Sequence, residues 1–174
     1  MNIQINIRIA HIDDLPFIVD IYNQAIRSGQ ATGDMKEFNV EERFTWFEKF
    51  DSNSYPIYVA ETKNKVVGYC TLSPYRPGRQ AMQTVAEIGY FLHHSFHRQG
   101  IATALLKHVI SDCSRLRILS LLAIILDINT PTIGLLENFN FEKWGYFPGI
   151  IDMDGKKYGQ FVYGLIIKDQ QESP

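Results

Sequence analysis

The stretch FHRQGIATALLKHV, residues 96–109, places a basic loop with one glycine directly before an apolar helical pattern. The first turn of a helix leaves free N–H groups and a partial positive charge, and Gly100 with the small Ala102 lets an anion approach the backbone closely. Further side-chain donors in the same stretch are His97, Arg98, Gln99 and Thr103. The dinucleotide and nucleoside-triphosphate loop motifs are both absent. The spacing therefore suits a phosphate-binding loop of another kind. The alternative is an ordinary helix that begins at Gly100 and has solvent-exposed basic residues before it, which would have the same pattern.

A single carboxylate, Glu87, lies in the otherwise apolar strand TVAEIGYFL, residues 84–92, upstream of this loop. Burial among apolar neighbours would raise its pKa toward the range in which a carboxylate works as a general base. Its target would be an ammonium group, because a free amine with a pKa of about 10 is almost wholly protonated at neutral pH. The alternative is an ordinary carboxylate on the solvent face of a strand.

The composition indicates one folded domain over residues 1–167, followed by a disordered tail, 168–174. The chain has 174 residues, of which 45% are hydrophobic and 13% aromatic, enough for a real core. A formal net charge of -2 gives no reason to expect nucleic acid or an anionic membrane as partner, so a small molecule is expected. No signal peptide and no apolar run of membrane-spanning length is found, which indicates a cytoplasmic protein.

Neither the cysteines nor the histidines predict a metal or redox site. Cys70 and Cys113 lie far apart in apolar settings without a C-x-x-C pair, which is typical of buried small hydrophobic residues. His93, His94 and His97 share one loop but have no cysteine or carboxylate partner at metal-ligand spacing. No metal is therefore expected.

The periodicity of apolar residues predicts the elements that must position these groups. Residues 3–9 alternate as a strand, and Asp13 is expected to cap a helix that ends near Gly29. A second helix begins at Asn39, with Glu42 at capping-box spacing. Further strands are expected over 56–61, 66–72, 84–92, 119–126, 141–147 and 158–167, with helices over 100–115 and from 130 onward. The order β-α-α-β-β-β-α-β-α-β-β indicates an α/β or α+β fold with a mixed sheet and helices on its faces.

HRQGIA, residues 97–102, resembles the R/Q-x-x-G-x-G/A motif of the GNAT superfamily of acyl-CoA-dependent N-acetyltransferases. The element order matches that fold over nearly the whole chain. The resemblance implies a single domain with a mixed, mostly antiparallel, twisted sheet and about four flanking helices. Within the superfamily the chain is most similar to the phosphinothricin and methionine-sulfone acetyltransferase branch, in RIAHIDDLPFIVDIYNQAI, YPIYVAE, VVGYCTLSPYRP and TVAEIGYFLHHSFHRQGIATALL.

This resemblance implies acetyl-CoA as co-substrate and assigns residues to it. In the family, backbone N–H groups of the motif hold the pyrophosphate, the end of the preceding strand pairs with the pantetheine arm, and an asparagine further on contacts CoA. The cofactor-binding residues implied here are Tyr90, Phe91, Leu92, His97, Arg98, Gln99, Gly100, Ile101, Ala102, Thr103 and Asn129. Glu87 matches the catalytic glutamate of the branch, which favours the general-base role over the solvent-face alternative.

Three positions depart from the family pattern. His97 stands where Arg or Gln is usual, so its contribution to anion binding would depend on pH. Leu136 occupies the position of the Tyr or His that serves the leaving thiolate, and Asn140 replaces the usual glycine before Phe141. Because a thiol pKa of about 8.5 lets solvent protonate the leaving group, this loss should slow an enzyme more than abolish its activity. The candidate substitutes, among which the sequence does not choose, are Tyr90, Tyr146 and Tyr158.

The acceptor site is expected in the loops beside Glu87. Arg76 and Arg79, in SPYRPGRQ, could grip a carboxylate or phosphinate in bidentate fashion, and two solvated loop arginines are the alternative. The backbone of Val85 and Ala86 would line the same pocket. An oxyanion would be held by a backbone N–H at the end of the Glu87 strand.

The leading hypothesis is an enzyme that acetylates the amino group of a small amino-acid-like acceptor, of the phosphinothricin or methionine-sulfone type, with Glu87 as base. One alternative acetylates a protein N-terminus or a polyamine, although no carboxylate cluster accompanies Glu87 for a polyamine. Another is a non-catalytic acyl-CoA-binding module, which the departures at Leu136 and Asn140 keep open. The resembled branch tends to be dimeric, so a homodimer is also open; the sequence itself gives neither the oligomeric state nor the acceptor.

Overall fold

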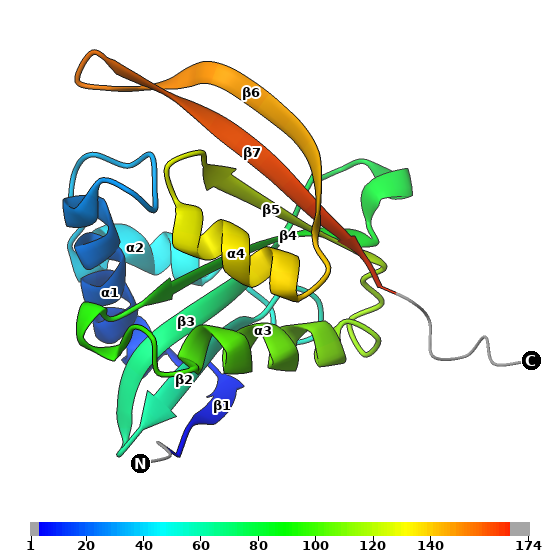
Figure 1. The fold of residues 1–174 in the computed structure, drawn as a ribbon. Coiled ribbons are helices and arrows are strands. Elements are labelled where there is room, and N and C mark those ends of the chain that lie inside the picture. The colour runs from blue at the N-terminus through cyan, green and yellow to red at the C-terminus, as the bar shows by residue number, and fades with distance from the viewer. Residues whose placement is uncertain (1–3, 168–174) are drawn as a thin grey trace, which may run out of the picture.

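The apolar patterns fold in the predicted order over residues 4–167, the part of the chain that this computed structural model describes (Figure 1). The strands are β1 Asn6–Ile9, β2 Ile57–Thr62, β3 Lys65–Pro74, β4 Val85–Leu92, β5 Ser120–Leu126, β6 Glu142–Met153 and β7 Lys156–Ile166. The α-helices are α1 Leu15–Ser28, α2 Val40–Phe47, α3 Ile101–Asp112 and α4 Thr130–Asn138. None of the described helices is long and apolar enough to cross a membrane. The tail predicted over 168–174 lies outside the described residues.

One sheet contains all of these strands, in the order β1-β2-β3-β4-β5-β7-β6, and β4 with β5 is its parallel pair. These two strands pair only where Val85, Ala86 and Glu87 lie opposite residues 120–122. Beyond Glu87 they diverge, as Figure 1 shows, and β4 continues to Leu92 with β3 as its partner. The backbone of β4 therefore borders a gap on its β5 side, where its polar groups need partners from elsewhere.

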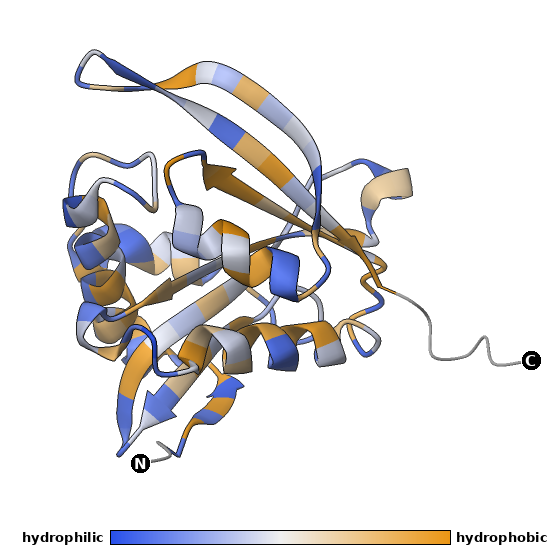
Figure 2. Ribbon diagram, in the orientation of Figure 1, coloured by the Kyte–Doolittle hydropathy of each residue, from blue (hydrophilic) through white to orange (hydrophobic). Residues whose placement is uncertain are grey.

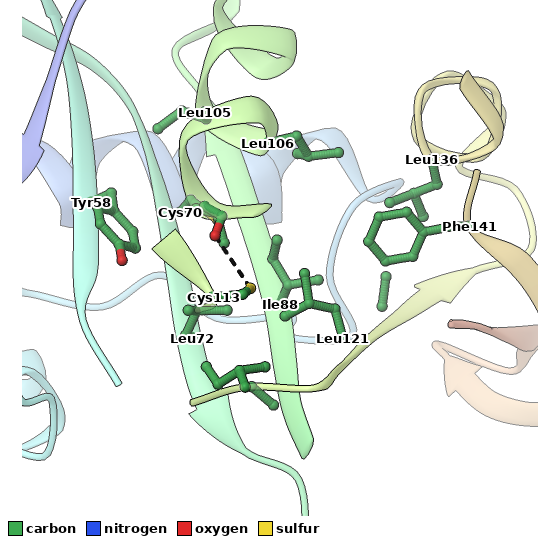
Figure 3. Packing of buried hydrophobic residues seen from close by; sticks show 14 of the residues in the cluster. Tyr58, Cys70, Leu72, Ile88, Leu105, Leu106, Cys113, Leu121, Leu136 and Phe141 are labelled. Carbon is green, nitrogen blue, oxygen red and sulfur yellow. Dashed lines mark hydrogen bonds between the residues drawn. The ribbon is translucent and has the colours of Figure 1, made fainter. Parts of the chain in front are cut away.

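Helices cover both faces of the sheet, and each face has its own apolar cluster. On one face α3 and α4 pack through residues such as Leu105 and Leu136, which are fully buried (Figure 3). On the other face Ile18 and Ile21 of α1 contact Tyr69 of β3. Figure 2 shows β5 as hydrophobic along its length, as expected of a strand covered on both faces. Successive residues of β4 therefore point alternately toward α3 and toward α1.

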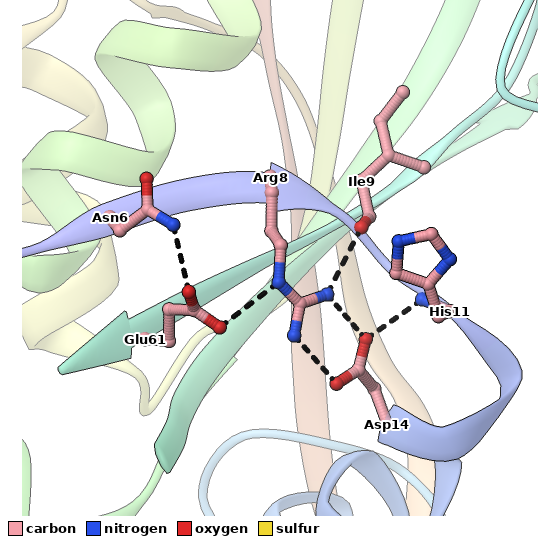
Figure 4. Close-up of polar contacts among 6 residues, drawn as sticks. All are labelled: Asn6, Arg8, Ile9, His11, Asp14 and Glu61. Atoms are coloured by element: carbon pink, nitrogen blue, oxygen red, sulfur yellow. Dashed lines mark hydrogen bonds and ion pairs between the residues drawn. The ribbon is translucent and has the colours of Figure 1, made fainter. Parts of the chain in front are cut away.

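The start of α1 differs from the predicted cap at Asp13. Asp14 is the N-cap residue and makes no side-chain cap bond, because its carboxylate accepts from Arg8 at 2.6 and 2.9 Å and from the His11 amide at 2.8 Å (Figure 4). Arg8 Nε also donates to Glu61 at 3.0 Å. Burial by itself would raise the pKa of Asp14, but the bonds from Arg8 and His11 outweigh it and lower that pKa. The network ties β1 and β2 to the beginning of α1.

The start of α2 confirms the predicted capping box. The Asn39 side chain accepts from the Glu42 amide, and the Glu42 carboxylate accepts from the Asn39 amide, both at 2.8 Å. Each satisfies a donor that the first turn leaves without a partner inside the helix. This local motif therefore fixes the residue at which α2 begins.

The last two strands are longer than predicted. β6 runs through Pro148 and Gly149 to residue 153, where the expected strand ended at 147. Proline and glycine weaken the interior of a strand, but β6 lies at the edge of the sheet, where proline is tolerated. The chain then turns through Asp154 and Gly155, both at positive φ, into β7.

Candidate active site

At the gap between β4 and β5 lies a cavity of about 500 Å³. Its walls come from the end of β4, the starts of α3 and α4, and the end of α1. It is lined by every predicted cofactor-binding residue except Gln99: Tyr90, Phe91, Leu92, His97, Arg98, Gly100, Ile101, Ala102, Thr103 and Asn129. The fold therefore brings together groups that the sequence separates by up to 39 positions, from Tyr90 to Asn129.

The backbone at the start of α3 is arranged for an anion. Gly100 is the N-cap residue with a φ of 80°, and Arg98 has a φ of 59°. Left-handed residues next to right-handed ones turn successive N–H groups toward one point, and the first turn of α3 adds free N–H groups and the positive end of the helix dipole. Glycine suits position 100 because an L side chain is strained at this φ. The main chain can thus hold a phosphate without side chains.

The side chains of this loop are placed less directly. His97 lines the cavity, with Nε2 3.3 Å from the Leu92 carbonyl oxygen. Gln99 turns away from it, because its Nε2 donates to the Ser95 carbonyl oxygen at 3.1 Å. Gln99 therefore stabilises the loop, and a contact with a cofactor would have to come from its backbone. Around these histidines and elsewhere in residues 4–167, no group of three or more His, Cys, Asp or Glu side chains is placed to hold a metal ion.

Asn129 caps α4 at the opposite wall of the cavity. Its Oδ1 accepts from the Thr132 amide at 3.4 Å. Thr132 also lines the cavity, and its Oγ1 accepts a hydrogen bond from the Tyr90 hydroxyl at 3.1 Å. Two helix N-termini therefore face the same cavity, and a tyrosine of β4 is bonded to the second of them.

Sequence reasoning missed the wall contributed by α1 and the loop after it. The lining residues from this segment are Gln24, Ala25, Ser28, Gln30 and Ala31. Gln24 Oε1 accepts from the His94 amide at 2.9 Å and lies 2.7 Å from His94 Nδ1, across 70 positions of sequence. No local sequence pattern predicts a contact between residues so far apart in the chain. The sequence shows only that the helix ends near Gly29.

Glu87 is the last β4 residue paired with β5 before the strands diverge. Its side chain is half-buried on the α1 side of the sheet, in register with Ser73 of β3. Burial raises the pKa of the Glu87 carboxyl above its ordinary value, and no neighbouring charge contributes to this rise. A carboxylate in this state is suited to accept a proton.

The residues predicted to hold the acceptor are spread more widely. Arg76 and Arg79 are exposed in the loop between β3 and β4, and the Arg76 guanidinium lies 5.3 Å from the centre of the Tyr75 ring. Val85 is partly buried on the same side of β4 as Glu87. Ala86 is 0% exposed, and its side chain packs in the cluster under α3, so that only its backbone could take part in an acceptor site.

The positions around the expected thiolate site have clear structural roles. Leu136 is 0% exposed and packs beside Phe141 (Figure 3), so it offers no hydrogen bond to a ligand. Asn140 has a φ of 61°, a conformation that glycine usually supplies and asparagine tolerates. Tyr146 is 45% exposed and donates to Asp127 at 3.0 Å. Of the tyrosine candidates only Tyr90 lines the cavity.

A larger cavity, of about 1160 Å³, lies at the other end of α3. It is bounded by the α3–β5 loop, the end of α4, the start of β6 and the end of β7, and its charged lining residues are Lys107, Arg117 and Glu142. None of the predicted site residues lines it. Among the described residues that line this cavity there is no helix N-terminus and no half-buried carboxylate. Despite its size, it therefore has, among these residues, no group suited to bind a phosphate or to accept a proton in the way proposed for the smaller cavity.

The sheet gap, the anion-binding start of α3 and the nearby carboxylate define a class of protein, the acyl-CoA-dependent transferases. The profile of the Acetyltransferase (GNAT) family matches residues 16–141. YwnH of Bacillus subtilis, assigned as a phosphinothricin acetyltransferase, is 35% identical over 159 residues, 91% of this chain and 96% of that protein. The L-methionine sulfoximine/L-methionine sulfone acetyltransferase of Pseudomonas aeruginosa is 28% identical over 158 residues, 90% of this chain and 89% of that protein.

A solved structure agrees with these relatives. The crystal structure of an N-acetyltransferase from Staphylococcus aureus Mu50 has a TM-score of 0.89 and 31% identity, and the match covers 95% of this chain and 99% of that one. The chain belongs to the GNAT family and is an N-acetyltransferase, for which acetyl-CoA is the acetyl donor. The family and fold expected from the sequence are confirmed.

Proposed function

We propose that this enzyme acetylates the amino group of a small amino-acid-like acceptor, and that Glu87 is its general base. The observation that carries the proposal is the position of Glu87, half-buried at the point where β4 and β5 separate and with a raised pKa. There it can take the proton of an ammonium group on the α1 side of the sheet while the acetyl donor occupies the gap. The names of the Bacillus and Pseudomonas relatives support an acceptor of the phosphinothricin or methionine-sulfone type.

The proposed reaction is a direct attack within a ternary complex. Glu87 removes a proton from the bound ammonium, and the free amine attacks the thioester carbonyl. Backbone N–H groups of β4 beyond Glu87, which have no β5 partner, would stabilise the developing oxyanion. The start of α3 anchors the pyrophosphate through its main chain, which positions the donor for attack.

A panel of acceptors tests both parts of this proposal. Purified enzyme is mixed with acetyl-CoA and with methionine sulfone, phosphinothricin, common amino acids, a polyamine or a peptide with a free N-terminus, and thiol release and acetylated product are measured. We expect the first two acceptors to react best, and Glu87→Gln to lower kcat/KM by about a hundredfold or more. Glu142→Gln, an exposed strand glutamate, is the matched control and should change little. Preference for the peptide or the polyamine would overturn the acceptor class.

We propose further that the enzyme is a homodimer that uses the β6 edge. β6 exposes several large apolar side chains along an unpaired strand edge, which are Trp144, Tyr146, Phe147 and Ile150. Sedimentation should show a dimer that Phe147→Ser with Ile150→Ser dissociates. Phe17→Ser, at an equally exposed residue of α1, should leave the dimer intact. A monomeric wild type at micromolar concentration would refute this.

We also propose a cytoplasmic location. Cys70 and Cys113 are free and buried, which suits a compartment where thiols stay reduced. Fractionation of cells that produce the protein should recover it with cytoplasmic markers; recovery with an oxidising compartment would contradict the proposal.

A further inference from the structure

The chain has no hydrogen-bond donor at the α4 position that usually serves the leaving thiolate, because Leu136 is apolar and fully buried. Two hydroxyl groups, those of Tyr90 and Thr132, line the proposed cofactor cavity instead. The Tyr90 hydroxyl reaches from β4 to the first turn of α4 and donates to Thr132 Oγ1 at 3.1 Å. Both residues line the cavity, and Tyr90 packs against the same apolar cluster that contains Leu136. A phenol therefore approaches α4 from the sheet, where the family pattern has a side chain of α4 itself.

Tyr90 and Glu87 lie on opposite faces of β4. Ala86 and Ile88 belong to the cluster under α3, which Tyr90 also contacts, whereas Phe91 packs against α1 together with Tyr69. By alternation along the strand, Glu87 shares the face of Phe91. The two functional side chains are three residues apart, about 10 Å along the strand. Glu87 is the last residue before β4 loses its β5 partner, and Tyr90 lies within the unpaired stretch.

We propose that the Tyr90 hydroxyl stabilises the departing thiolate from the face opposite Glu87. With CoA bound, its single proton turns from Thr132 Oγ1 to the thiolate sulfur, and the Thr132 hydroxyl donates to the Tyr90 oxygen instead. Thr132 is a positioning residue in this arrangement. The inference deepens the proposed function and rests on it, because it concerns the same acetyl transfer.

Burial raises the pKa of Tyr90 to about 12, well above the thiol value of about 8.5. The phenol therefore keeps its proton at neutral pH and stabilises the thiolate by hydrogen bonding alone. As the carbon–sulfur bond breaks, its electron pair goes to sulfur. The bound ammonium loses two protons in all, one before the amine attacks and one as the new carbon–nitrogen bond forms. Glu87 takes each in turn and passes it to solvent, and the thiolate later takes a proton from water. Every proton is thus accounted for without a tyrosinate.

The decisive measurement is the pKa of the thiol of free CoA bound to the enzyme, followed through the ultraviolet absorbance of the thiolate. In the wild type we expect a pKa below the ordinary value of about 8.5, and in Tyr90→Phe a pKa raised by about one to two units, since a hydrogen bond to a charged group is worth tenfold to a hundredfold in equilibrium. Thr132→Val should give a smaller rise. Tyr146→Phe, which removes a hydroxyl that does not line the cavity, is the matched control.

Kinetics and binding separate this role from a structural one and from failure of the proposed function. Tyr90→Phe should lower kcat about tenfold to a hundredfold with little change in the acceptor KM or in the Kd of CoA. Glu87→Gln should leave the bound-thiol pKa as in the wild type. If no acceptor reacts, the proposed function fails, yet the thiol titration still decides the role of Tyr90. The same thiol pKa in wild type and Tyr90→Phe would overturn the inference, even if kcat fell.

Discussion

The proposed cofactor side and the proposed acceptor side of the active site consist of different kinds of chemical group. The cradle at the start of α3 consists of main-chain groups, set by the left-handed Gly100 and by the helix itself. The expected acceptor side consists of exposed side chains in the β3–β4 loop, Arg76 and Arg79, with the first of them resting on the Tyr75 ring. Glu87 lies on β4, which follows the β3–β4 loop at one end and lines the cavity at the other.

This difference explains which changes each side tolerates. A backbone site survives replacement of neighbouring side chains, so His97 can stand where the family has Arg or Gln while the N–H groups of the cradle stay in place. A side-chain site changes its preference with each substitution, and loops of this kind vary without cost to the core. The donor is therefore expected to be common to the family, and the acceptor is expected to be specific to the chain.

The first and largest prediction concerns the residue that joins the two sides. We expect kcat/KM to fall about tenfold for each pH unit below the pKa of Glu87. Because burial raises that pKa, the fall should begin at a higher pH than it would for an ordinary glutamate. The sign follows from the role, since only the ionised carboxylate accepts a proton. A pH–rate profile with two acceptors whose amines differ in pKa checks this.

The limb that belongs to Glu87 should stay at the same pH for both acceptors and vanish in Glu87→Gln. A limb that moves with the amine of the acceptor would assign it to the substrate instead.

The second prediction uses a matched pair of glycines, one on each side. Gly100 and Gly78 have φ values of 80° and 79°, and a Cβ at either would meet no atom within 4 Å, so alanine costs only backbone strain. Gly100→Ala should raise the Kd of CoA about five- to thirtyfold and leave the acceptor KM unchanged. Gly78→Ala should raise the acceptor KM and leave the Kd of CoA unchanged. Calorimetry measures the Kd of CoA for each variant, and steady-state kinetics measure the acceptor KM. If both variants raise the Kd of CoA equally, the two sides do not differ in the way described.

The third prediction tests the side-chain nature of the acceptor site. Arg79→Ala should raise the acceptor KM about tenfold with the acetyl-CoA KM unchanged, because a bidentate bond to an anionic group is lost. Arg76→Ala should have a smaller effect, since its guanidinium is already engaged over Tyr75. If all three proteins have the same KM for an acceptor that carries its carboxylate, both arginines are surface residues only.

The smallest effect on catalysis is expected from a network that touches neither side. Asp14→Asn weakens the bonds to Arg8 and should lower the free energy of unfolding by about 1–3 kcal/mol, with both KM values unchanged. The folded pKa of Asp14 is lowered, so its contribution is present above its unfolded pKa and is lost as pH falls through the folded value. Urea unfolding at neutral and acidic pH should show the two proteins converging at low pH; a constant difference would exclude Asp14.

The predictions for the central part of the proposed site came from local patterns. The glycine before an apolar helix, the lone carboxylate in an apolar strand and the Asn39 capping box each depend on neighbours within a few residues. The contacts that sequence reasoning missed are long-range. Gln24 meets His94 across 70 positions, and the Tyr90–Thr132 bond joins β4 to α4 across 42. The prediction of Asp13 as the cap was wrong: the N-cap of α1 is the neighbouring Asp14, which Arg8 of β1 holds by an ion pair.

The sequence by itself determined the family and the order of the elements, and it predicted where an anion cradle would lie, because helix starts and strand alternation are properties of adjacent residues. Only the tertiary structure decided which hydroxyl stands beside the cradle, that Leu136 and Ala86 point into the core, and that α1 closes the cavity. The physical reason is the divergence of β4 from β5: it opens a gap whose walls come from four elements, and no local pattern records which side chains will face it.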